Sequence, residues 1–147
     1  MQLLSIEEDY ALRAIIFLSC QPKGKVNFVS DIAENQRIPV NFLFKILRKL
    51  VKKGIVKSFR GPHGGYVLDK DPAQITFLEV IETIDGPLVV NRCLNTAPIS
   101  RCVLEDSCKM MSAWERIQLN IKEELGALTI ADLLKPAQKE PKHPAAV

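Results

Sequence analysis

The sequence predicts a mainly α-helical fold that carries one small β-hairpin and a long helix near its C-terminal end. Apolar residues recur at helical spacing over residues 5–20 and 40–54. A tip rich in glycine and proline, RGPHGG, separates two short strand-forming runs at 55–59 and 65–68. Apolar residues spaced three and four apart follow within residues 114–125. At 147 residues the chain is long enough for one domain core and an accessory element.

The first two helices are predicted from periodicity and capping residues. The first runs from about Ser5 to Cys20, and the segment QPKGK ends it. Cys20, at the end of this apolar helix, is expected to be a small core residue. Ser30 is expected to cap a short second helix over residues 31–36, where early acidic residues suit the positive end of the helix dipole.

The third predicted helix has two distinct faces. Pro39 stands at its start, where a helix tolerates proline, and Gly54 supplies a C-terminal cap. One apolar stripe comprises Phe42, Leu43, Ile46, Leu47, Leu50 and Val51, and lysine and arginine occupy most other positions. A short helix, a tight turn and a basic amphipathic helix are typical of a helix-turn-helix, whose second helix of the pair reads the major groove.

The hairpin that follows is typical of a wing. Its glycines, Gly64 among them, allow the backbone to approach phosphates closely. Arg60 at the tip can enter a minor groove. His63 is interpreted as an exposed wing residue near phosphate rather than as a metal ligand.

The charge distribution also indicates nucleic acid as a partner. Residues 1–71 hold twelve Lys/Arg and seven Asp/Glu (+5), whereas residues 72–147 hold eight and ten (−2). No acidic residue lies between Glu34 and Asp69, a window that contains eight basic residues. A concentrated positive surface binds a polyanion because each neutralised phosphate releases counterions.

A fourth helix and a long fifth helix are expected in the C-terminal half. Thr76 and Glu79 have the spacing of a capping box, and the buried face comprises Phe77, Val80, Ile81 and Ile84. The narrow stripe of the long helix comprises Trp114, Ile117, Ile121 and Leu125, and favours a two-fold dimer contact. Thr129 and Asp132 then cap a last short turn.

Three of the four cysteines, Cys93, Cys102 and Cys108, fall within sixteen residues of a polar segment. We expect a cytoplasmic protein for two reasons. The N-terminal residues are acidic where those of a signal peptide would be cationic, and the sequence has no apolar run long enough to span a membrane. Thiols stay reduced in the cytoplasm, so the spacing Cys-x8-Cys-x5-Cys favours metal or redox chemistry over a disulfide. Soft thiolates suit iron–sulfur clusters, and three of them leave one position to a more labile ligand. Zinc with a carboxylate, and a metal-free thiol switch, are the alternatives.

The sequence resembles the Rrf2 (Rrf-two) family of bacterial winged-helix transcription regulators, which includes iron–sulfur regulators of the IscR and NsrR type. The resemblance covers about residues 1–135 and is carried by DYALRA, by FLFKILRKLVKKGIVKSFRGPHGGYVL and by the three-cysteine segment before a tryptophan-bearing helix. It implies a homodimer on a near-palindromic operator. It also implies, for many members, an iron–sulfur cluster (4Fe-4S or 2Fe-2S) near the dimer interface that changes the DNA-binding state.

The resemblance also implies roles for individual residues. A histidine that some relatives use as the fourth ligand is replaced by Met111 here, and in the nitric-oxide-sensing branch an acidic residue of the partner subunit's first helix takes that place. That residue matches Asp9, with Glu8 as the alternative. Phe44 stands where some relatives have an acid; phenylalanine cannot accept a hydrogen bond from cytosine but can contact a thymine methyl group. The residues expected to contact DNA are Asn41, Phe42, Phe44, Lys45, Arg48, Lys49, Lys52, Arg60, His63 and Gly64.

The predicted organisation has four parts. They are a winged helix-turn-helix domain (1–90), a cysteine-bearing loop (91–109), a dimerisation helix with a terminal turn (110–135) and a disordered tail (136–147). The favoured function is a dimeric DNA-binding regulator that senses nitric oxide, redox or iron and cluster status. The alternative is a winged-helix module for protein interaction or electron transfer. An enzyme is not expected, since no nucleophile–base pair can be placed beside either histidine.

Overall fold

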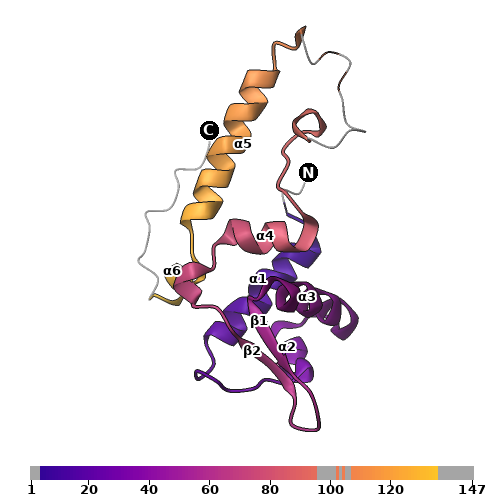
Figure 1. Ribbon diagram of the computed structural model, residues 1–147, viewed down its shortest axis with the longest axis vertical. Coiled ribbons are helices and arrows are strands. Elements are labelled where there is room, and N and C mark those ends of the chain that lie inside the picture. Colours follow the sequence, from indigo (N-terminus) through magenta and orange to yellow (C-terminus); the bar gives the residue numbers. More distant parts are fainter. Residues whose placement is uncertain (1–3, 96–101, 103, 105–106, 136–147) are drawn as a thin grey trace, which may run out of the picture.

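The computed structural model describes residues 4–95, 102, 104 and 107–135, and these form a winged helix-turn-helix with a C-terminal helix (Figure 1). Three helices and a two-stranded antiparallel wing make up the lower part of the molecule, and α4 lies across them. The long helix α5 rises away from α4 toward the end of the molecule opposite the wing. The elements are α1 (Ile6–Ser19), α2 (Val29–Gln36), α3 (Val40–Lys53), β1 (Val56–Phe59), β2 (Gly65–Leu68), η1 (Pro72–Gln74), α4 (Phe77–Asp85), η2 (Arg92–Leu94), α5 (Met111–Ala127) and α6 (Ile130–Leu134).

Helix α1 begins at a complete capping box. Ser5 Oγ accepts a hydrogen bond from the backbone N–H of Glu8 at 3.2 Å, and Ser5 N–H donates to Glu8 Oε2 at 2.6 Å. The helix ends at Cys20, whose side chain is exposed. The expectation that Cys20 is a core residue is therefore wrong, because this residue caps the last turn and no longer follows the buried face.

Helix α2 begins earlier than its serine predicts. Asn27 forms an isolated bridge with Tyr66 of the wing, with N···O distances of 3.0 and 2.8 Å, and keeps the chain extended up to Phe28. The helix then starts at Val29, with Phe28 at the N-cap and no side-chain cap. Ser30 lies inside the first turn, so the expectation that it caps α2 is wrong.

The wing is fixed to the body at this bridge. Strands β1 and β2 pair in the register Val56↔Leu68 to Phe59↔Gly65. Gly65 has a φ of +156°, and a Cβ atom there would collide with the backbone carbonyl of Asn27. Only glycine allows the wing to approach so closely. Ile55 is fully buried and donates its N–H to Leu50 O at 3.0 Å, which closes the end of α3 before β1 begins.

One hydrophobic core joins α1, α2, α3, α4 and α6. The side chains that α3 contributes to it are Leu43, Ile46, Leu47 and Leu50. Phe42 was expected in the same stripe but is 38% exposed, and its ring packs edge-on against Tyr10 with centroids 6.1 Å apart. That part of the prediction is wrong because Phe42 lies on the flank of the helix, beside α1.

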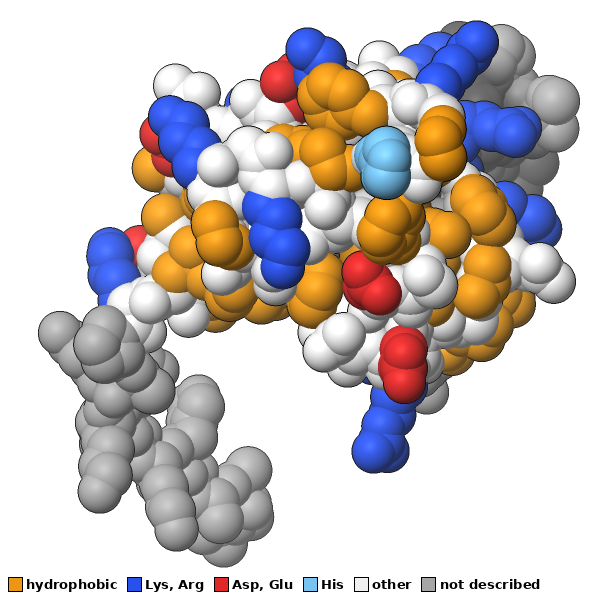
Figure 2. All heavy atoms as spheres, turned by 90° about the horizontal axis from the view of Figure 1, so that it is seen from below, with side chains coloured by type: hydrophobic (Ala, Val, Ile, Leu, Met, Phe, Trp, Pro, Cys, Tyr) orange, Lys and Arg blue, Asp and Glu red, His pale blue; other side chains and the backbone are white. Residues whose placement is uncertain are grey.

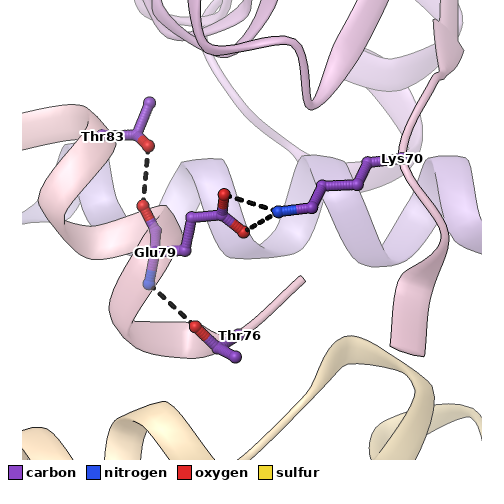
Figure 3. Close-up of polar contacts among 4 residues, drawn as sticks. All are labelled: Lys70, Thr76, Glu79 and Thr83. Atoms are coloured by element: carbon purple, nitrogen blue, oxygen red, sulfur yellow. Dashed lines mark hydrogen bonds and ion pairs between the residues drawn. The ribbon is translucent and has the colours of Figure 1, made fainter. Parts of the chain in front are cut away.

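Thr76 is the N-cap of helix α4, as predicted, but only one of the two hydrogen bonds of a capping box is present (Figure 3). Thr76 Oγ1 accepts from Glu79 N–H at 3.1 Å. Both carboxylate oxygens of Glu79 instead accept hydrogen bonds from Lys70 Nζ, each at an N···O distance of 2.7 Å. A charge-assisted pair is stronger than a hydrogen bond to a backbone N–H, so Lys70 takes the carboxylate and ties the end of the wing to α4.

The chain returns to the core after α5. Phe77 N–H donates to Leu128 O at 3.0 Å, and Ile130 N–H donates to Ile75 O at 2.9 Å. The predicted cap of the last turn is confirmed, since Thr129 and Asp132 form a full capping box that starts α6. Within the described ranges, none of the helices combines the length and the apolar character needed to cross a membrane. The tail from residue 136, predicted to be disordered, lies outside the described residues.

Candidate nucleic-acid interface and cysteine segment

Helix α3 presents a polar ridge on the side opposite its buried residues. At about 100° per residue, the positions farthest from the core-facing leucines and isoleucine are spaced three and four apart. The four residues there are all exposed: Asn41, Lys45, Arg48 and Lys52. With no acidic residue in α3, this ridge is a continuous positive strip along the helix. It has the charge and shape that a DNA groove requires.

Lys49 is not on this ridge. Its Nζ atom donates to the carbonyl oxygen of Ile84 at 2.7 Å and lies 3.6 Å from Glu7 Oε2. The side chain therefore turns toward α4 and the start of α1. These contacts give Lys49 a structural role in joining α3 to α4.

The wing lies beside the ridge of α3. Arg60 and His63 at its tip are exposed and Gly64 is half-buried. A shallow groove of about 370 Å³ separates the wing from α3, and the residues that line it are Phe44, Arg48, Val51, Ser58, Arg60 and Tyr66. Seen from the wing end, hydrophobic and basic side chains share this face of the molecule (Figure 2).

Three groove residues had not been predicted at the interface: Val51 on α3, and a pair of wing residues, Ser58 and Tyr66. Ser58 and Tyr66 are direct cross-strand partners in the wing. Strand alternation places both on one face of the hairpin, and this signal could have assigned them to the groove from the sequence.

The aromatic rings near the interface differ in how they are held. Phe42 packs against Tyr10, and Lys45 Nζ lies 5.9 Å from the centroid of the Phe42 ring. Phe59 on β1 is 45% exposed, with Lys57 Nζ 5.5 Å from its centroid. Phe44 is 48% exposed and makes neither kind of contact with the residues that the structure describes.

The described parts of the cysteine segment (residues 91–109) that adjoin α4 and α5 lie on the side of the molecule opposite the wing (Figure 1). Cys93 is on the short helix η2, between α4 and the loop, and Cys108 precedes α5. Cys93, Cys102 and Cys108 are half-buried and free. Their donor chemistry fits an iron–sulfur cluster, which takes thiolates. Among the described residues, no three His, Cys, Asp or Glu side chains are grouped to hold a metal ion.

The two acidic candidates for a fourth ligand have different surroundings. The Glu8 carboxylate is buried and is used in the capping box with Ser5. Burial raises the pKa of Glu8, and the nearby charge of Asp85 acts in the same direction. The Asp9 carboxylate is 57% exposed, and its one ion pair is with Arg13 at 3.4 Å. A surface pair of this kind is weak, so the Asp9 carboxylate is the more available of the two.

Helix α5 buries none of its seventeen residues fully. Two of its side chains make polar contacts with other described elements: Gln118 Oε1 accepts a hydrogen bond from Val90 N–H at 3.1 Å, and Lys122 pairs with Glu82 at 3.2 Å. The predicted apolar stripe is only partly covered. Trp114, Ile121 and Leu125 are half-buried, and Ile117 is 39% exposed.

Comparison with known proteins gives one consistent family. The model of the Rrf2 family, described as "Iron-dependent Transcriptional regulator", matches residues 4–136. The regulator NsrR of Shouchella clausii is 31% identical over 134 residues, covering 91% of this chain and 89% of that protein. The regulator IscR of Xenorhabdus nematophila is 30% identical over 132 residues, covering 90% and 79%.

Solved structures agree. CymR, the global cysteine regulator of B. subtilis, superposes with a TM-score of 0.72 at 28% identity, covering 90% of this chain and 96% of that one. IscR of T. potens superposes with a TM-score of 0.71 at 27% identity, covering 92% of both chains. Similar proteins thus include regulators named for different roles, while the winged-helix architecture is shared.

Proposed function

The chain belongs to the Rrf2 family of DNA-binding transcriptional regulators, and from this premise we propose that it is a homodimeric, operator-binding regulator whose cysteine segment holds an iron–sulfur cluster. The family is one of regulators and not of enzymes. The cluster makes the protein a sensor of nitric oxide, redox or iron and cluster status. A near-palindromic operator follows from two copies related by a two-fold axis.

The DNA side of the proposal rests on the ridge and the wing. The ridge of α3 enters a major groove, where Asn41 contacts base edges and Lys45, Arg48 and Lys52 contact phosphates. Arg60 at the wing tip reaches the adjacent minor groove, beside His63 and Gly64.

Helix α5 supports the dimer. A helix of seventeen residues without a fully buried one is unusual for a packing helix, since a helix in a domain buries one stripe. Its half-covered stripe, from Trp114 to Leu125, is the surface on which a second copy packs. Such a contact places the two cysteine segments near the two-fold axis, because Cys108 lies just before α5.

The observation that carries the cluster assignment is the set of three free, half-buried thiols on the segment between α4 and α5. Four ligands complete the common clusters, and three cysteines leave one position open. Asp9 of the second subunit fills that position. Its carboxylate is exposed, whereas that of Glu8 is committed to the cap of α1.

Anaerobic purification tests this proposal directly. We expect brown protein with visible absorption and with iron and sulfide in amounts close to equimolar, and loss of all three after C93S/C102S/C108S substitution. C20S is the matched control, since Cys20 is a free thiol at the end of α1, and its replacement should leave the colour unchanged. Asp9→Ala should make the cluster more easily lost, whereas Glu8→Gln should not.

Other outcomes would identify the alternatives. Colourless protein that contains zinc would replace the cluster with a tetrahedral zinc site. Metal-free protein whose operator affinity changes on thiol oxidation would make the segment a thiol switch. Brown protein that binds no duplex would indicate an electron-transfer module.

A further inference from the structure

We propose that Phe44 recognises a thymine in each operator half-site by contact with its C5 methyl group. This inference rests on the proposed function, because it concerns the DNA that the ridge and the wing bind. It names a base and the residue that selects it.

The exposure of Phe44 is the first argument. Phe44 is 48% exposed and lies in the second turn of α3. The neighbouring rings have partners within the chain: Phe42 packs on Tyr10, and Phe59 lies under Lys57. Phe44 has no aromatic or cationic partner among the described residues. An exposed apolar side chain of this size on a binding face indicates a contact made in the complex.

The position of Phe44 is the second argument. It lines the groove between α3 and the wing together with Arg48, one helical turn later, and Arg60. These two guanidinium groups flank the ring with positive charge, and Lys45 is next to it in the sequence. DNA phosphates that pair with the basic groups bring base edges against the surface between them, where the ring lies.

The chemistry of the major groove supplies the third argument. The thymine methyl group is the apolar feature that bases present there, and phenylalanine is among the side chains that contact it. Cytosine presents an amino donor at the corresponding edge. A phenyl ring cannot accept its hydrogen bond in the plane of the base, so the donor would lose its water without replacement. Contact with Phe44 therefore favours thymine over cytosine.

Deoxyuridine provides the test because it pairs as thymidine does and lacks only the methyl group. Duplexes bound by the wild-type protein are selected from a randomised library, and the preferred duplex is then made with thymidine or with deoxyuridine throughout. Burying one methyl group corresponds to about a fourfold change in affinity, and two symmetric contacts to about fifteenfold. We expect wild-type protein to bind the thymidine duplex more tightly by a factor in this range.

The variants separate Phe44 from a general effect of deoxyuridine on duplex shape. Phe44→Ala should bind both duplexes equally, and Phe44→Leu should keep part of the difference. Phe59→Ala is the matched control, since it removes a similarly exposed ring that does not line the groove, and it should keep the wild-type ratio. Thermal unfolding verifies that each variant is folded.

Three results would overturn the inference: equal wild-type affinity for the two duplexes, a Phe44→Ala variant that keeps the wild-type ratio, or a preferred half-site without thymine. A wild-type protein that selects no duplex from the library would instead remove the operator-binding function on which the inference rests.

Discussion

Lys49 Nζ donates a 2.7 Å hydrogen bond to the carbonyl oxygen of Ile84, and this bond joins the DNA-facing helix α3 to the last turn of α4. The carbonyl end of a helix carries partial negative charge, so an ammonium group there is stabilising. Glu7 at the start of α1 lies 3.6 Å from the same nitrogen. Helix α4 precedes the cysteine segment, so Lys49 links α3 to the helix from which that segment continues.

We expect Lys49→Met to destabilise the fold and to leave the DNA electrostatics almost unchanged. Methionine cannot donate the hydrogen bond, so the Ile84 carbonyl oxygen is left to bond with water. We expect the free energy of unfolding to fall by about 1 kcal/mol. Urea denaturation measures this change. The matched variant Lys52→Met should leave stability unchanged but weaken binding to any duplex and lower the salt slope by about one. Equal salt slopes for the two variants would contradict these separate roles.

Arg60→Ala should weaken specific operator binding by about 1–3 kcal/mol, because a minor-groove contact at the wing tip is lost. Its side chain is exposed, so the stability of the protein should not change. Arg60→Lys keeps the positive charge without the planar guanidinium and should recover only part of the affinity. Titration of labelled duplexes by fluorescence anisotropy measures the operator affinity of both variants. If Arg60→Ala bound the operator as tightly as the wild type, the wing would have no part in recognition.

Ile117→Glu should convert the dimer to a monomer. Ile117 belongs to the partly covered stripe of α5 and is 39% exposed, so glutamate is tolerated in the single chain but not in an apolar contact between two chains. Sedimentation equilibrium measures the mass. Leu119→Glu is the matched control, because Leu119 is 56% exposed and lies outside the stripe, and it should remain dimeric. A dimeric Ile117→Glu protein would place the dimer contact elsewhere.

A double-mutant cycle should detect the pair between Lys70 and Glu79 (Figure 3). Their side chains are 32% and 23% exposed, so solvent screens the pair only in part, and we expect a coupling of about 0.5–1 kcal/mol. The variants are Lys70→Met, Glu79→Gln and the double variant, each measured by urea denaturation. The more exposed pair between Arg13 and Asp9 should give coupling close to zero. Similar coupling in both pairs would show that partial burial does not strengthen the first.

Glu8→Gln should stabilise the protein increasingly as the pH rises. Burial raises the pKa of Glu8 above its ordinary value of 4.5, so the folded state holds the proton more tightly than the unfolded state. The contribution of Glu8 to stability is therefore fully present below pH 4.5 and is lost as the pH rises through the folded-state pKa. Glutamine cannot ionise and escapes this loss.

Urea denaturation of both proteins from pH 4.5 to neutral pH measures the difference. A stability difference for Glu8→Gln that stays constant over the same range would contradict the predicted cause.

Local patterns were enough to predict most of the elements. The leucine and isoleucine periodicity of α3 identified its buried face, Gly54 marked its end, and Thr129 marked the start of α6. In each case the signal and the structure that it specifies lie within a few residues. The wing was predicted for the same reason, since the glycines of its tip and the flanking strands are adjacent in the chain.

Contacts between distant segments were not predictable in this way. The sequence alone determined a winged helix-turn-helix, a basic recognition helix and a cysteine-rich segment, because periodicity, caps and composition are local properties. Only the tertiary structure decided that Lys49 turns toward Ile84, that the Asn27 bridge starts α2 at Val29, and that Phe44 faces the groove beside Arg60. These outcomes depend on which surfaces pack together. Side chains with the same local spacing can have different partners, and only tertiary packing determines which partner each one has.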